Sequence, residues 1–132
     1  MISNFERDTV RLSGYEKNEL MPAVIEKLKT CVGKRKVITN KKLIRQHLGY
    51  YVVDPARLRK VINYIRNNNL ISGLVATSRG YYIAENREEL EQYVKSLQGR
   101  IAAITAIRNS VMQQMDELFP TEQKNQKEED HE

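Results

Sequence analysis

The stretch that decides the fold is DPARLRKVINYIRNNN, residues 54–69. Asp54 followed by Pro55 is a strong start signal for a helix, because Asp caps free backbone amides and Pro fits the first helical position. Apolar residues recur at helical spacing and predict one buried face: Leu58, Val61, Ile62 and Ile65. The opposite face carries basic and amide side chains: Arg59, Lys60, Asn63 and Asn67. We therefore expect a helix that reaches about Asn68 and has a basic outer surface.

A short hairpin is predicted directly after this helix. Two β-prone segments, residues 74–76 and 81–84, are joined by Thr77-Ser78-Arg79-Gly80. Gly80 can adopt the positive φ that a tight loop requires. We expect the inward-facing side chains to be those of Val75, Tyr81 and Ile83.

Two shorter helices are predicted before residue 54. The first runs from about residue 19 to 32, with Asn18 as its cap and Gly33 as its stop. Its apolar stripe includes Cys31, which we interpret as a buried small side chain rather than a reactive thiol. The second runs over residues 41–48 with Asn40 as its cap. A basic run, residues 34–36, and a short β-prone piece, residues 37–39, lie between the two helices.

A long helix is predicted over residues 86–119, from the cap Asn86 to the stop Pro120. One side follows heptad spacing, with a single cation in the series: Leu90, Val94, Leu97, Ile101, Ile104, Arg108, Val111, Met115 and Leu118. Such a helix is about 50 Å long and cannot cover this stripe against so small a domain. The pattern favours pairing between two copies, and the alternatives are folding back onto the domain or docking on another protein.

Charge is distributed unevenly along the 132 residues, whose formal net charge is +5. Residues 16–84 carry fourteen Lys or Arg against four acidic side chains, a charge of +10. Residues 85–132 carry six against eleven, a charge of −5. This asymmetry favours a polyanion as the partner of the basic part.

Composition also indicates a compartment and argues against several classes of protein. No run approaches the ~20 apolar residues of a membrane span, and the first residues lack the order of a signal peptide. The single cysteine excludes an internal disulfide, so we expect a cytoplasmic protein. His47 has no other metal-ligand residue beside it, and His131 lies in the tail. No phosphate-binding glycine loop or nucleophile–base pair is present. We therefore expect no enzymatic activity, no cofactor and no metal.

The order of these elements resembles the winged helix-turn-helix DNA-binding family, over residues 19–84. The likeness is carried by the caps Asn40 and Asp54-Pro55, the turn at Gly49 and the closing wing at residues 79–82. The segment 80–84, followed by an acidic helix start, is also similar to small winged-helix proteins of phages and prophages. One departure is the turn at residues 50–53, which is longer and more aromatic than a minimal helix-turn-helix turn.

The resemblance implies that the helix after Asp54 enters the major groove of DNA and that the wing contacts the adjacent backbone. Arg and Asn side chains suit guanine and adenine edges, so the candidate base contacts are Arg59, Lys60, Asn63 and Asn67. The candidate phosphate contacts are Lys34, Arg35, Lys36, Lys41, Lys42, Arg45 and Arg79.

The sequence thus predicts a mainly α chain with a small β-hairpin wing and a long coiled-coil-like helix. We expect an N-terminal arm at 1–15, a winged-helix domain at 16–84, the long helix at 85–119 and a disordered acidic tail at 120–132. The function expected is sequence-specific binding of double-stranded DNA by a homodimer, as a transcriptional regulator or a phage or plasmid replication accessory. The alternative is a protein-interaction adaptor, such as a phage-encoded inhibitor that binds a host protein.

Overall fold

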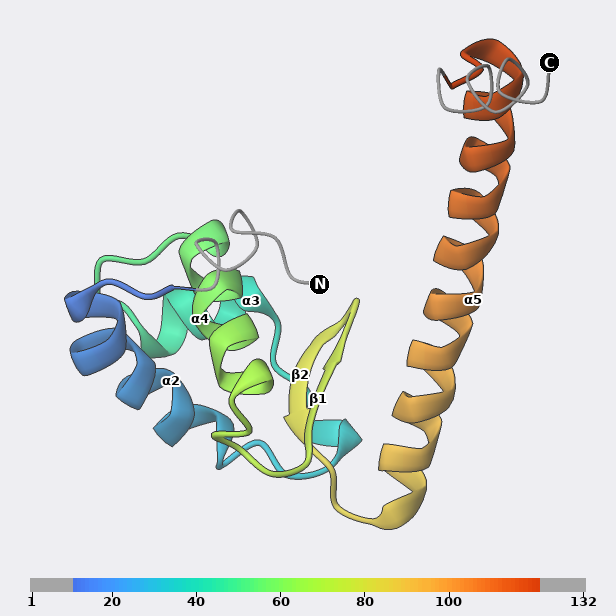
Figure 1. Cartoon of the computed structure of the whole chain (residues 1–132). Helices are drawn as coiled ribbons and strands as arrows, with labels where there is room; N and C mark the ends of the chain where they lie inside the picture. The colour runs from blue at the N-terminus through green and yellow to red at the C-terminus, as the bar shows by residue number, and fades with distance from the viewer. Residues whose placement is uncertain (1–10, 122–132) are drawn as a thin grey trace, which may run out of the picture. The chain divides into compact units, whose positions relative to one another are not determined.

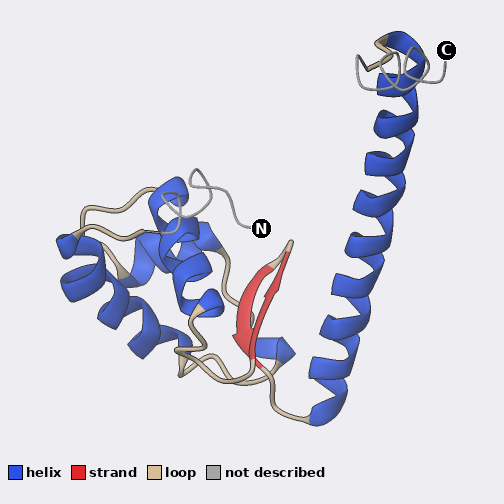
Figure 2. Cartoon of the chain, in the orientation of Figure 1, coloured by secondary structure: helices blue, strands red, loops and turns tan. Residues whose placement is uncertain are grey.

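The computed structural model describes residues 11–121 of the chain. It is mainly helical, with one antiparallel hairpin and a long C-terminal helix (Figures 1 and 2), which confirms the expected class at this level. The elements in order are η1 (Glu16–Leu20), α2 (Met21–Leu28), η2 (Lys34–Lys36), α3 (Asn40–His47), α4 (Pro55–Asn67), β1 (Leu74–Thr77), β2 (Gly80–Ile83) and α5 (Arg87–Leu118). Most of the expected arm and tail, residues 1–10 and 122–132, lies outside the described residues. The described residues form two compact units, 11–91 and 92–121.

The first helical segment begins and ends earlier than the sequence predicted. The Ser13 amide donates to the Glu16 carboxylate at 2.8 Å, and the Glu16 amide donates to the Ser13 hydroxyl at 3.2 Å. This reciprocal capping box starts the helix before Asn18, so Asn18 is not its cap. The α-helix ends at Leu28 rather than residue 32, because the chain beyond it pairs with β2 instead.

The next two helices have well-defined caps. Thr39, not Asn40, caps α3, and its hydroxyl accepts a hydrogen bond from the Lys42 amide at 3.1 Å. Asp54 caps α4 as predicted, with its carboxylate accepting from the Arg57 amide at 2.7 Å. Pro55 occupies the first position of α4, which ends at Asn67, close to the expected boundary.

The hairpin is held to the preceding chain by backbone pairing on both sides of η2. Ile38 and Tyr81 exchange two N–H···O bonds of 2.9 Å. The Ile83 amide donates to the Cys31 carbonyl, and the Gly33 amide donates to the Ile83 carbonyl, both at 2.7 Å. The short β-prone piece expected at residues 37–39 therefore exists as a single bridge beside β2 rather than as a strand of its own.

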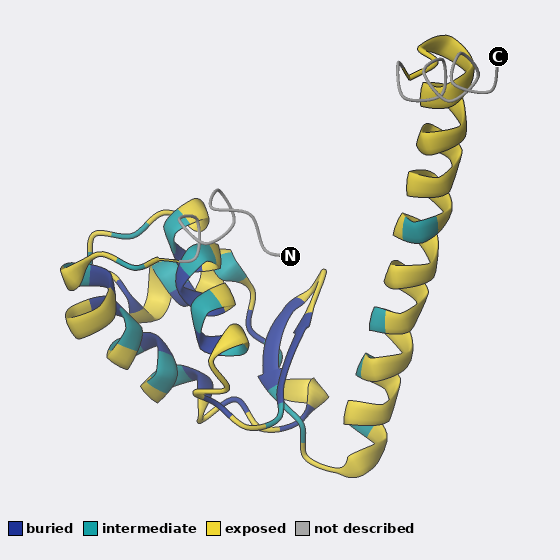
Figure 3. Cartoon of the chain, in the orientation of Figure 1, coloured by how far each residue is buried: buried dark blue, intermediate teal, exposed yellow. Residues whose placement is uncertain are grey.

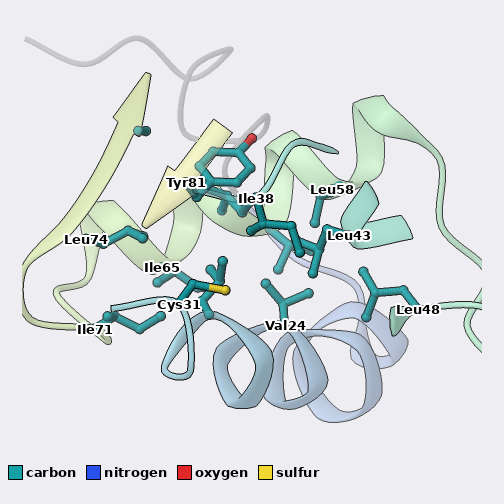
Figure 4. Packing of buried hydrophobic residues seen from close by; sticks show 14 of the residues in the cluster. Val24, Cys31, Ile38, Leu43, Leu48, Leu58, Ile65, Ile71, Leu74 and Tyr81 are labelled. Atoms are coloured by element: carbon teal, nitrogen blue, oxygen red, sulfur yellow. The ribbon is translucent and has the colours of Figure 1, made fainter. Parts of the chain in front are cut away.

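The core of the first unit lies between α2, α3, α4 and the hairpin (Figures 3 and 4). The predicted inner face of α4 is confirmed, since its four apolar side chains are at most 2% exposed. Cys31 is buried in the same cluster, beside side chains of α2 and α4 (Figure 4), as the sequence predicted. Truncating a buried Leu or Ile of this kind to Ala typically costs about 2–5 kcal/mol.

The long helix α5 starts at the predicted cap. The Asn86 side chain accepts from the Glu89 amide at 3.0 Å. The Glu89 carboxylate accepts from the Glu85 amide at 2.7 Å and from the Lys34 amide at 3.0 Å, so it joins the helix start to η2. Most of the heptad side chains of α5 are exposed (Figure 3), for example Ile101 at 64% and Ile104 at 66%. Among the described residues, no helix combines the length and the hydropathy needed to cross a membrane.

Candidate nucleic-acid interface

The outer face of α4 is divided into two sides by a buried carboxylate. Glu16, only 3% exposed, accepts a hydrogen bond from Arg57 Nε at 2.8 Å and one from Lys60 Nζ at 3.0 Å. Arg57 also donates through Nη1 to the Val52 carbonyl at 2.8 Å, and its guanidinium lies 5.5 Å from the centre of the Tyr15 ring. The side of α4 that faces η1 is therefore committed to internal contacts.

Glu16 is charged over the whole physiological pH range. Burial by itself raises the pKa of this carboxyl. Hydrogen bonds from the Ser13 amide, Lys60 and Arg57 outweigh burial and lower the pKa from 4.5 to about 2. A buried carboxylate is tolerable only with such partners, since an unpaired buried charge is strongly destabilising. Lys60, a candidate base contact, thus already has an intramolecular partner.

The other side of α4 faces the wing. Arg59, Asn63 and Asn67 have exposed side chains, which is the placement that base contact requires. Burial raises the pKa of Tyr81 in β2, while a hydrogen bond with Asn40 and the charges of Arg59 and Arg66 act in the opposite direction. Arg59 and Arg66 of α4 therefore act on Tyr81 of the hairpin through their charge, and Asn40 of α3 reaches it by a hydrogen bond.

A shallow groove of about 240 Å³ separates the start of α3 from the wing tip. It is lined by residues 39–41 of α3 and its cap and by residues 77–81 of the hairpin. Lys41 and Arg79, two candidate phosphate contacts, both belong to this lining. The Arg79 amide donates to the Thr77 hydroxyl at 3.1 Å, which orders the tip of the wing. We call the exposed residues of α4 together with this groove the wing-side surface.

The remaining phosphate candidates lie on exposed positions of η2 and α3. They are Lys34, Arg35, Lys36, Lys42 and Arg45. Arg35 approaches Glu85 at 3.7 Å, but both side chains are largely exposed, so this pair is weak. Lys42 and Arg35 line a second hollow that does not include the wing, so the structure does not bring all of the candidates to one surface.

The residue that sequence reasoning missed is Glu16. Its signal was present as Ser13-Gly14-Tyr15-Glu16, which fits the pattern of a capping box. That pattern locates the helix start, but it carries no information about Arg57 and Lys60, which lie 41 and 44 residues further along the chain.

The described part of the chain contains no group of three or more His, Cys, Asp or Glu side chains that could hold a metal ion. No protein-family model, no curated protein and no solved structure matches the chain.

Proposed function

We propose that the chain binds double-stranded DNA through a winged helix-turn-helix head, as a transcriptional regulator or a phage or plasmid replication accessory. The observation that carries this proposal is the wing-side surface. It combines the exposed Arg59 and Asn63 of α4 with Lys41 and Arg79 across a groove beside the wing. The backbone bonds between Ile38 and Tyr81 support it further, because they fix the hairpin next to the start of α3.

Base contact is assigned to the exposed candidates of α4 other than Lys60. Arg59 suits a guanine edge, and Asn63 and Asn67 suit adenine edges. Lys41 and Arg79 would bind backbone phosphates on either side of the groove, and these contacts set register rather than sequence preference. Lys60 is excluded from base contact, because it pairs with Glu16 and its release would leave a buried carboxylate with one partner fewer.

Dimerisation through α5 is the second part of the proposal. Val94 and Ile101 occupy one heptad position and Leu90 and Leu97 the other, an arrangement that favours two parallel strands. Arg108 interrupts the apolar series, and a polar residue at such a position restricts the register of pairing. Two heads held by one coiled coil would meet two half-sites on DNA.

Titration of labelled duplex DNA, followed by fluorescence anisotropy at rising salt, tests the DNA proposal. The Arg59→Ala, Asn63→Ala double variant is expected to weaken binding to a selected site at least about tenfold, since one good base pairing is worth ~1–3 kcal/mol. Lys95→Ala is the control, because it removes a cation from α5 in the second unit and changes no residue of α4 or of the groove. Absence of binding at about 50 mM salt, or equal loss in the variant and the control, would refute the proposal.

A protein-interaction adaptor, for example an inhibitor of a host protein, is the second candidate function. The observation in its favour is the width of the apolar face in the C-terminal half of α5. Ile107, Met112 and Phe119 are exposed at 50–73% and flank the heptad series. At 100° per residue the apolar arc is about 140° wide, which is broader than the seam of a two-stranded coiled coil. Light scattering discriminates the two, because a monomeric chain would favour the adaptor.

A further inference from the structure

A second basic surface lies outside the wing-side surface. It is a cleft of about 410 Å³ between the end of α2, η2 and α3. Its cations come from all three elements, and the described residues that line it include no acidic side chain. We call it the α2–α3 cleft, and its polar lining consists of Lys27, Thr30, Arg35, Lys36, Lys42, Gln46 and His47.

Successive residues of α3 belong to the two different basic surfaces. Lys41 lines the wing groove, whereas Lys42 lines the α2–α3 cleft. Neighbouring residues of a helix project about 100° apart, so their side chains serve different faces. No residue is shared between the linings of the two hollows.

The positive charge in the cleft is not neutralised locally. Lys27, Lys36 and Lys42 form no ion pair within the described part of the chain, and the Arg35 contact with Glu85 is long and exposed. The pKa of His47 is lowered, first by burial and then by the charges of Lys27 and Lys42. Lysines from separate elements thus line one hollow, and the positive charges of Lys27 and Lys42 disfavour protonation of His47.

We propose that the α2–α3 cleft binds a multiply charged phosphate group. Lysine ammonium groups are effective phosphate ligands as point charges, and the Gln46 amide adds a neutral donor. The volume of the cleft exceeds one phosphate and suits a phosphorylated group of nucleotide size. The phosphates would belong either to the backbone of a bound nucleic acid or to a free compound. The proposal does not depend on the wing-side surface, because a small anion tests it separately.

Inorganic pyrophosphate, titrated into the full-length chain in chloride buffer, is the probe. Calorimetry measures the dissociation constant, and the amide signals of Thr30 and Gln46 report the place of binding by NMR. The Lys27→Gln, Lys42→Gln double variant is expected to bind about tenfold more weakly, or worse, because two charge-assisted contacts are lost. The matched control is the Lys41→Gln, Arg45→Gln double variant. It also removes two positive charges, but neither residue lines the cleft.

The outcomes distinguish binding at the cleft from an effect of net charge, and they identify the source of the phosphates. The proposal is overturned if pyrophosphate does not bind saturably, or if the two double variants weaken binding equally, which would indicate net charge alone. If the cleft variant also lowers the salt dependence of duplex binding by about two counterions, the phosphates are those of the DNA backbone. If pyrophosphate binding is lost while the salt dependence is unchanged, the ligand is a free phosphorylated compound. Circular dichroism of each variant confirms folding.

Discussion

Replacing Glu16 by Gln is expected to destabilise the head by about 3 kcal/mol at pH 7. Gln keeps the size of Glu and retains an oxygen that accepts from the Ser13 amide, so the capping contact survives. The lost contribution is the negative charge between Arg57 and Lys60, at 2.8 and 3.0 Å. Lowering the pKa of Glu16 from 4.5 to about 2 corresponds to this free energy, at about 1.4 kcal/mol per pKa unit.

The sign of the pH dependence follows from the lowered pKa. The ion network stabilises the folded state fully above pH 4.5, the ordinary pKa of the carboxyl, and its contribution is lost as pH falls towards 2. At pH 3 less than about half of it remains. The difference in stability between the wild type and Glu16→Gln should therefore shrink between pH 7 and pH 3.

Urea unfolding followed by circular dichroism at pH 7, 5 and 3 measures this effect. Glu19→Gln is the control, because Glu19 is exposed and lies on the same helical turn. It should change the free energy of unfolding by less than about 0.5 kcal/mol at every pH. Equal effects of the two variants, or a Glu16→Gln difference that does not depend on pH, would refute the assignment of Glu16 as the buried charge that holds α4.

Three further substitutions test the wing, the start of α5 and the proposed dimer. Gly80→Ala is expected to cost at least about 2 kcal/mol in urea unfolding, because φ is +132° and a Cβ would collide with the backbone of the neighbouring segment. Gly49→Ala, which meets nothing within 4 Å, is its control, and equal costs would contradict the account. Glu89→Ala should cost about 1–2 kcal/mol by freeing two backbone amides, whereas exposed Glu88→Ala should be nearly neutral in the same assay. Arg108→Leu should tighten dimerisation about tenfold in analytical ultracentrifugation, and a chain that stays monomeric would contradict the coiled coil.

Local signals in the sequence were sufficient to predict where α4 and α5 begin and end. Asp54 and Asn86 use their own side chains to bind amides three residues on, so their effect depends on no distant part of the chain. The buried face of α4 follows from spacing alone, because a helix with one apolar stripe has one way to bury it. The ends of both elements agree with the prediction, and so does the buried face of α4.

The ends of the first helical segment and the faces of the hairpin depended on tertiary contacts. Residues 29–32 continue a helical pattern, but the Cys31 carbonyl and the Gly33 amide pair with Ile83 of β2, and that pairing overrides the local preference. In the hairpin, Val75 is opposite Tyr82 and Ala76 is opposite Tyr81. Leu74, Ala76 and Tyr81 belong to the core cluster. Val75 is buried as expected, at 1% exposed, but it lies on the face of the hairpin opposite to Tyr81. A strand offers only two faces, and a shift of one residue exchanges them.

The sequence predicted the candidate interface as a set of charged side chains. The structure shows which of them already have an intramolecular partner. A helical projection places Lys60 on the outer face of α4 beside Arg59, and nothing in the sequence distinguishes the two. Lys60 points to the side where Glu16 is buried, and Arg59 to the side of Tyr81. Positive charge available to a polyanion is therefore greater on the wing side of α4, since Glu16 offsets one of the two positive charges on the other side. In the proposed complex, a duplex that approaches α4 would be drawn towards the wing, where Lys41 and Arg79 would hold its phosphates.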